Sequence, residues 1–195
     1  MSGSNNRALS PHIKDRTYLV KNSLTGPADS LYKYLRAAIA RADHIRFLAA
    51  FITESGARLL AKPLREAAER GAVVKILTGT YMNTTEPYAL EYLMEKVGTG
   101  LTIRSYSETG RSFHAKAYFF DYPEDSEVFI SSANLSWTAL TTGVEWSYRL
   151  RKSQARQDYK EFSQEFDRLE RDQSVLVTQE FLREYERARR EQAQK

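Results

Sequence analysis

The sequence predicts an α/β fold in which a mixed, largely parallel β-sheet is flanked by helices and followed by a C-terminal helical extension. Two observations predict this class. Helical and strand patterns alternate from about residue 29 to residue 104, which is the order of a parallel sheet with helical crossovers. Three strand patterns then follow between residues 113 and 150 with short connections, which favours hairpin-type neighbours in the same sheet.

The first half of the chain supplies the alternation. A helix is expected to begin near Asp29, which can cap it, and the apolar run at 44–52 is typical of a buried strand. A second helix is predicted over 55–70, where Pro63 should kink or interrupt it and Gly71 should end it. The remaining elements are predicted as a strand at 73–78, a helix at 85–97 and a strand at 101–104.

The second half adds strands and then helices. Strands are predicted at 113–121, 127–132 and 143–150, a short helical turn at 133–140, and helices at about 153–171 and 178–193. The apolar stripes of the last two helices are expected to pack against the body or a partner helix. We therefore divide the chain into an extension (1–26, with a short strand at 17–20), a central domain (27–151) and a C-terminal helical segment or linker (152–195).

Composition restricts the possible chemistry. The chain has no Cys and three His among 195 residues, which excludes thiolate nucleophiles and Cys-ligated metal sites. We expect no metal and no cofactor. The net charge of +4 permits a polyanionic partner without requiring one. The sequence has neither a secretory signal pattern nor an apolar run of transmembrane length, so a cytoplasmic protein without a membrane partner is expected.

Chemically useful side chains gather between residues 112 and 145. His114 and Lys116 are two apart on a predicted strand and therefore share a face. A Lys offers a point charge to a phosphate, and a His can attack phosphorus or shuttle a proton. Ser132 and Asn134 supply donors at a predicted turn. Glu145, on the next strand, can hold one ring nitrogen of a His and fix its tautomer.

These residues resemble the HxKx4D…GSxN…E signature of the phospholipase D superfamily, and the resemblance covers residues 29–150. The nuclease branch is the most similar: small bacterial endonucleases, some metal-independent restriction enzymes, and nuclease-like domains at the start of certain DEAD/DEAH-box helicases. The signature in this chain reads His114-x-Lys116-x4-Asp121, then Ser131-Ser132-Ala133-Asn134, then Glu145. Ser131 stands where the family has Gly, and the hairpin before it is longer than usual.

The resemblance implies a mechanism. In such enzymes two copies of the motif face each other: one His attacks phosphorus, the other protonates the leaving oxygen, and no metal takes part. Because this chain has one motif, a homodimer is implied. Carried over to this sequence, His114 is nucleophile or acid, and Lys116 and Asn134 bind phosphate. Ser132 supports a phosphate oxygen or the turn, and Glu145 orients His114. Asp121, seven residues from His114, points to the opposite face of a regular strand and is expected to be structural.

Further candidates lie outside the signature. Tyr81 and Asn83 follow the carboxyl end of a predicted parallel strand, where α/β folds bind ligands. Arg104 and Arg111 flank the loop before the motif and are candidates for contacts with nucleic-acid phosphates. Trp137 is expected to pack rather than to stack on a base.

The leading hypothesis is a metal-independent endonuclease that acts on DNA in preference to RNA. The main alternative is a nucleic-acid-binding or interaction module of a helicase or a defence complex, with weak or no cleavage. Phospholipase activity ranks last, because lipid-cleaving members of the family usually carry two motifs in a much longer chain.

Overall fold

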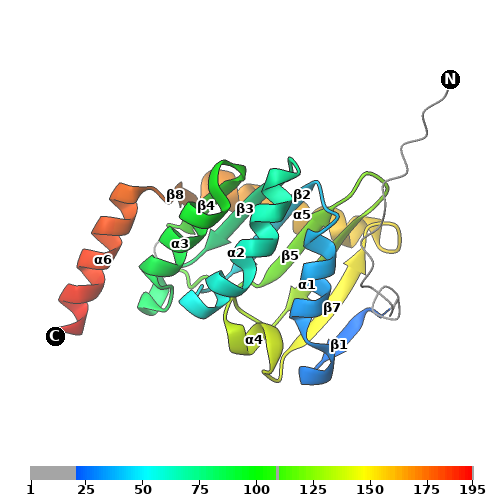
Figure 1. The fold of residues 1–195 in the computed structure, drawn as a ribbon, viewed down its shortest axis with the longest axis horizontal. Helices are drawn as coiled ribbons and strands as arrows, with labels where there is room; N and C mark the ends of the chain where they lie inside the picture. The colour runs from blue at the N-terminus through cyan, green and yellow to red at the C-terminus, as the bar shows by residue number, and fades with distance from the viewer. Residues whose placement is uncertain (1–20, 109, 195) are drawn as a thin grey trace.

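The computed structural model describes residues 21–108 and 110–194, so the strand expected at residues 17–20 lies outside the described residues. Within them the chain forms one sheet with helices on both of its faces (Figure 1). The strands are β1 (Ser23–Thr25), β2 (His44–Ala49), β3 (Val73–Thr78), β4 (Leu101–Tyr106), β5 (Ala117–Asp121), β6 (Ser126–Ser131), β7 (Trp146–Arg151) and β8 (Ser174–Leu176). The α-helices are α1 (Leu31–Ile39), α2 (Glu54–Glu69), α3 (Pro87–Val97), α4 (Trp137–Thr141), α5 (Arg156–Asp172) and α6 (Gln179–Ala193).

The sheet has eight strands in the order β1-β7-β6-β5-β2-β3-β4-β8. In the described part of the chain only the β2–β3 and β3–β4 pairs are parallel, and every other pair is antiparallel. The predicted mixed α/β class is confirmed, but the prediction of a largely parallel sheet is wrong. The helical crossovers α2 and α3 join only three strands, whereas a hairpin joins β5 to β6 and therefore makes them antiparallel.

Two hydrophobic clusters occupy the two faces of the sheet. The larger lies under α1, α2, α3 and α4, and the smaller lies under α5 (Figure 1). In β5, Tyr118 and Phe120 belong to the larger cluster, while Ala117 and Phe119 belong to the smaller. Because successive strand residues point to opposite faces, a central strand covered on both sides is apolar at every one of these positions.

Two details of the helices differ from the prediction. Helix α2 is continuous from Glu54 to Glu69 with Pro63 inside it, so Pro63 does not interrupt the helix. Leu60 and Leu64 of α2 are fully buried, and this packing offsets the hydrogen bond that a proline cannot make. Asp29 is not a cap: Ser30 is the N-cap residue of α1, and the Asp29 carboxylate pairs with Lys21 instead.

Both ends of the chain contribute to the sheet. β1 lies within the stretch interpreted as an N-terminal extension and pairs with β7. β8, which the sequence pattern did not reveal, adds an antiparallel edge strand beside β4. The apolar stripe that the sequence predicts for α5 consists of Tyr159, Phe162, Phe166 and Leu169. Three of these residues are buried as predicted, but Phe162 is 42% exposed. α6 then packs against α3, with the Tyr185 hydroxyl donating to the Thr85 carbonyl at 2.7 Å.

Candidate active site

The signature residues come to one end of the sheet, which we call the site edge. It is the end at which β2, β3 and β6 finish and at which β5 and β7 begin. The parallel pair finishes there at Ala49 and Thr78, and Ser131 at the end of β6 lies opposite Ser147 of β7. Ligands of α/β folds commonly bind at the carboxyl ends of parallel strands.

His114 and Lys116 lie in the irregular segment 113–116 that precedes β5, so the expectation that a strand begins at residue 113 is wrong. β2 finishes beside the start of β5, and the ladder on that side stops there. One further bond, from Ser131 N to Lys116 O at 3.1 Å, keeps the segment next to β6. His114 is exposed and Lys116 is half-buried, so both side chains can reach a substrate.

A close backbone approach holds this segment against the loop after β3. Phe113 is buried in the cluster under α5. A Cβ on Gly79 would lie 3.2 Å from Cδ1 of Phe113 and 3.1 Å from the carbonyl oxygen of Ala50. Only glycine fits this approach without displacement. The residue immediately before His114 is therefore fixed between the ends of β2 and β3.

The turn after β6 is closed by the hydroxyl of Ser131. This Oγ accepts from Ala133 N at 2.9 Å and is hydrogen-bonded to the Ser147 Oγ at 2.8 Å. The residue that replaces the family glycine thus fits and adds two bonds. The Ser-Ala-Asn turn is consequently stabilised by a side chain of its own sequence.

Asn134 is oriented by the end of β2. Its Oδ1 accepts from Phe51 N at 3.1 Å, and the next residue, Leu135, donates its N–H to the Phe51 carbonyl at 3.3 Å. Since Oδ1 is occupied by a donor, the Nδ2 group faces away from Phe51. Within the described residues Nδ2 has no hydrogen-bond partner, and it remains a donor for a ligand.

Tyr118 is a site residue that sequence reasoning missed. Its hydroxyl donates to the carbonyl of Ala133 at 2.7 Å, and its ring packs edge-on against Phe47 with centroids 5.1 Å apart. Full burial, followed by the negative charge of Glu145, raises the pKa of the phenol, which therefore stays protonated as a donor. The available signal was its position in the predicted strand 113–121, two residues after Lys116 and therefore on the same predicted face.

Glu145 and Ser132 form a pair at the start of β7. The Ser132 Oγ donates to Oε2 of Glu145 and accepts from Trp146 N at 3.0 Å. Among the described residues no hydrogen bond joins Glu145 to His114. The structure therefore brings Glu145 to the site edge, with Ser132 as its partner.

Asp121 lies at the other end of β5, away from the site edge. Its carboxylate accepts from the Tyr159 hydroxyl at 2.6 Å and pairs with Arg46 at 3.2 Å. The Arg46 guanidinium also bonds Ser163 of α5 at 3.0 Å. These contacts join α5 to the sheet, and the structural role of Asp121 stays a prediction.

The candidate residues outside the signature lie in different surroundings in the structure. Arg104 donates to the hydroxyl and carbonyl of Ser174, each at 2.7 Å, so its guanidinium joins β4 to β8. Arg111 is exposed in the loop before the motif. Tyr81 is 59% exposed, while Asn83 donates to Gln192 of α6. Trp137, expected to pack, is 46% exposed.

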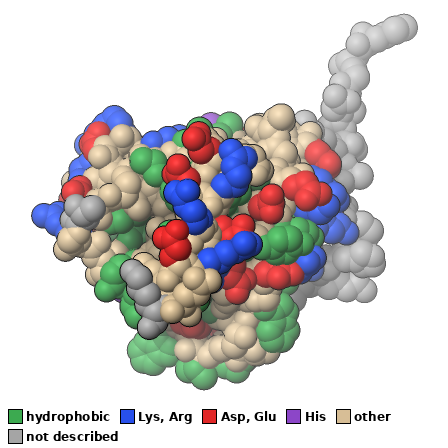
Figure 2. Space-filling view, turned by 90° about the vertical axis from the view of Figure 1, so that its left-hand side faces the viewer, with side chains coloured by type: hydrophobic (Ala, Val, Ile, Leu, Met, Phe, Trp, Pro, Cys, Tyr) green, Lys and Arg blue, Asp and Glu red, His purple; other side chains and the backbone are tan. Residues whose placement is uncertain are grey.

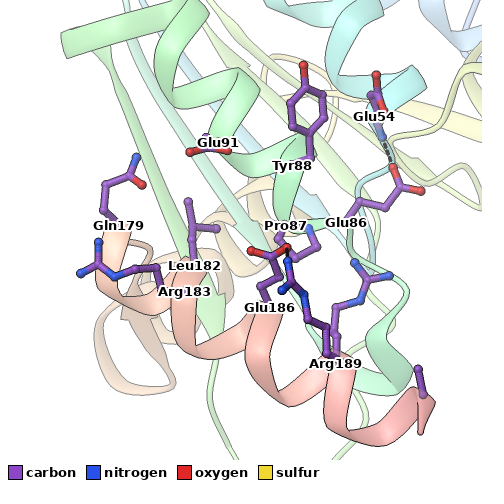
Figure 3. A pocket seen from close by; sticks show the side chains of 12 residues that line it. Glu54, Glu86, Pro87, Tyr88, Glu91, Gln179, Leu182, Arg183, Glu186 and Arg189 are labelled. Atoms are coloured by element: carbon purple, nitrogen blue, oxygen red, sulfur yellow. Dashed lines mark hydrogen bonds and ion pairs between the residues drawn. The ribbon is translucent and has the colours of Figure 1, made fainter.

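A charged groove of about 590 Å³ lies between α3 and α6, and no signature residue lines it (Figure 3). Glu86 accepts there from the Glu54 backbone N–H, and Arg190 pairs with Glu186 at 2.6 Å. The face that carries α6 shows basic and acidic side chains intermixed rather than a patch of one sign (Figure 2).

The described part of the chain lacks two features that would point to other kinds of site. No group of three or more His, Asp or Glu side chains there is arranged to hold a metal ion. None of its helices combines the length and the apolar character needed to cross a bilayer.

With this geometry in place, the chain can be compared with known proteins. The family model described as "Cardiolipin synthase, PLD-like domain" matches residues 35–170, which is more than half of the chain. The chain belongs to the phospholipase D superfamily. The predicted family is thereby confirmed. A comparison with curated protein sequences gives no significant match.

Solved structures share the fold of this PLD-like chain. Nuc, a phospholipase D family member from Salmonella typhimurium, is 23% identical with a TM-score of 0.64 over 80% of this chain and 95% of its own. NucT from Helicobacter pylori is 17% identical with a TM-score of 0.60, over 80% and 99% respectively. Polyphosphate kinase from Porphyromonas gingivalis is 12% identical with a TM-score of 0.60, over 83% and 24%. At these identities the likeness concerns the fold.

Proposed function

We propose that this PLD-like protein is a phosphodiesterase that hydrolyses nucleic acid, DNA in preference to RNA, through a covalent intermediate on His114. The observation that carries the proposal is the gathering of His114, Lys116, Asn134 and the Ser132–Glu145 pair at one edge of the sheet in a chain of this superfamily. The net charge of +4 suits a phosphate backbone.

In the proposed reaction, an imidazole nitrogen of His114 attacks phosphorus and the bond to the leaving oxygen breaks. The His114 of a second subunit protonates that oxygen, and water then displaces the histidine, which restores the enzyme. Lys116 and the Nδ2 group of Asn134 donate to the non-bridging oxygens, where charge increases in the transition state. One such donor is typically worth about 3 kcal/mol of barrier.

The Glu145 carboxylate has an oxygen available for the orienting role. Ser132 occupies Oε2, and Oε1 has no partner among the described residues. In the proposal Oε1 accepts from an imidazole N–H of His114 once substrate is bound, which fixes the tautomer that attacks. Tyr118 and Phe51 support the same site by holding the turn that carries Asn134.

The test is cleavage in excess EDTA. Plasmid and single-stranded oligonucleotide are incubated with the wild type, with His114→Ala, and with His44→Ala, whose exposed histidine begins β2 at the other end of the sheet. We expect EDTA-resistant cleavage by the wild type and by the His44 variant, and none by His114→Ala. An acid-labile phosphohistidine detected by mass spectrometry would identify the intermediate.

The other outcomes are equally informative. Cleavage that requires added metal and survives His114→Ala would contradict the mechanism. Retained binding without any cleavage would favour the alternative, a nucleic-acid-binding module of a larger assembly. For the shared site, excess His114→Ala protein mixed with wild type should lower activity, because mixed dimers contain only one copy of His114. Activity that is unchanged by mixing would contradict a dimer-shared site.

A further inference from the structure

Both tryptophans of the chain are exposed at the site edge. The chain contains two Trp, and these two side chains are 46% (Trp137) and 71% (Trp146) exposed. Trp residues are buried to a large extent on average. Leaving both of them open to solvent at the same end of the sheet therefore points to a use for their ring faces.

Each tryptophan lies close in the sequence to a predicted catalytic residue. Trp146 N donates to the Ser132 hydroxyl at 3.0 Å, and Trp146 directly follows Glu145. Trp137 follows Asn134 by three residues, begins α4, and donates its N–H to Ser55 Oγ at 3.2 Å. The two exposed indoles thus belong to residues that lie next to the Ser132–Glu145 pair and shortly after the turn that carries Asn134.

A third exposed aromatic side chain, Tyr81, belongs to the loop after β3. This loop begins at Gly79, whose backbone packs against the residue preceding His114. Met82 and Asn83 in the loop have positive φ angles of 55° and 56°, a conformation that is costly for residues other than glycine. The hydroxyl of Thr84 donates to the Tyr81 carbonyl at 3.0 Å, which helps to hold the loop in this shape.

We propose that Trp137, Trp146 and Tyr81 are stacking positions for unpaired bases, so that the preferred substrate is a single-stranded nucleic acid. The inference rests on the proposed function and names its substrate class. Aromatic side chains bind bases by their π faces irrespective of base identity. In a duplex those faces are already covered by neighbouring bases, whereas a single strand offers them to the protein while its phosphates reach Lys116 and Asn134.

The origin of the rings favours this use over a contact between two copies of the chain. The three residues come from three separate segments, the β3–α3 loop, α4 and β7, and each segment adjoins a stretch that carries predicted catalytic residues. Separate rings next to predicted phosphate-binding residues suit successive bases of one strand. A dimer contact through the same indoles is the competing outcome in the experiment below.

The experiment uses the full chain carrying His114→Ala, so that no substrate is cut. Binding of a labelled single strand, the matching duplex and an abasic strand of equal length is followed by fluorescence anisotropy in EDTA. Intrinsic fluorescence is recorded in parallel, and both emitting indoles belong to the proposed surface. Additional Trp137→Ala, Trp146→Ala and Tyr81→Ala changes are compared with Phe162→Ala, an aromatic residue of α5 that is 42% exposed.

We expect the single strand to quench the tryptophan fluorescence and to bind at least tenfold more tightly than the abasic strand. Each of the three substitutions should weaken binding of the single strand about tenfold and change binding of the duplex little. The Phe162→Ala substitution should change neither affinity appreciably. Equal binding of all three nucleic acids would overturn the proposal. The proposal would also be overturned if the tryptophan fluorescence changed with protein concentration instead of with oligonucleotide concentration and the Trp146→Ala protein sedimented as a monomer. That result would assign the indoles to a dimer contact. In the separate cleavage assay, EDTA-resistant cleavage by the wild type that does not distinguish single from double strands would leave the proposed function standing. It would reject this inference alone.

Discussion

The hydroxyl of Ser132 donates a hydrogen bond to the carboxylate of Glu145, and the two residues come from opposite ends of the β6–β7 connection. The same hydroxyl accepts from the backbone of Trp146 at 3.0 Å. One small side chain therefore fixes both the position of the carboxylate and the start of β7. Several consequences can be measured.

Ser132→Ala should lower kcat of the proposed phosphodiesterase by roughly 10- to 100-fold, because a hydrogen bond to a charged group contributes about 1.5–3 kcal/mol. Glu145→Gln should lower kcat as well, and the double variant should lose less than the product of the two single losses, since both disturb one pair. The measurement is steady-state cleavage by all four proteins. Fully multiplicative losses would show that the pair does not act as a unit.

Asp121→Asn should reduce the free energy of unfolding by about 1–3 kcal/mol, because it weakens a partly buried network with Arg46 and Tyr159. The activity of the folded protein should change little, since Asp121 lies away from the site edge. Urea denaturation and kcat are measured together. Asp167→Asn is the control: its side chain is 56% exposed in its contact with Arg46, so a loss below about 0.5 kcal/mol is expected. An inactive but stable Asp121→Asn protein would instead place Asp121 in the reaction.

Gly56→Ala should destabilise the protein by about 1–3 kcal/mol, although alanine normally stabilises a helix relative to glycine by about 1 kcal/mol. A Cβ at this position of α2 would lie 2.0 Å from the carbonyl oxygen of Leu135. The clash would displace the residue that follows Asn134, so activity should fall as well. Lys62→Ala on the exposed side of α2, where the Lys62 side chain is 76% exposed, should leave both quantities nearly unchanged. Thermal unfolding and cleavage assays test this, and a more stable Gly56→Ala protein would refute it.

Stability should decline at alkaline pH, in part through Tyr118. Burial and the nearby charge of Glu145 raise the pKa of this phenol above its usual value of 10.0. The unfolded chain therefore ionises first: the contribution is complete below about pH 10 and is lost as the pH rises further. Urea midpoints between pH 8 and pH 11 should fall less steeply in Tyr118→Phe than in the wild type. Identical slopes would exclude Tyr118 as a source of the decline.

Local patterns were sufficient for several elements and for the candidate set. Strand 73–78 was predicted with the bounds that β3 has, because a short run composed mostly of β-branched and aliphatic residues and followed by a glycine is a local signal. The signature residues could be named for the same reason, since each is recognised by its type and its spacing from its neighbours. The segment 113–116 was misjudged as strand, because its alternation resembles that of a strand while β2 ends too early to pair with it.

Long-range contacts account for what the patterns missed. β8 has only three residues and exists because the edge of β4 is open to it. Pro63 remains inside a helix because α2 is packed along its length. The exposure of Trp137 and Trp146 depends on which elements cover them, and the alternation of β7 carries no information about which face is buried.

Local propensity, periodicity and side-chain chemistry are sufficient to predict the α/β class, the order of helices and strands through most of the chain, and a set of residues able to bind a phosphate. Four other features emerge only in the folded chain: most strand pairs are antiparallel, Ser132 holds Glu145, Tyr118 supports the turn before Asn134, and two indoles remain exposed beside them. The physical reason is that pairing, burial and hydrogen-bond partnership are relations between residues far apart in the chain, which form only when the sheet brings its strand ends to one edge.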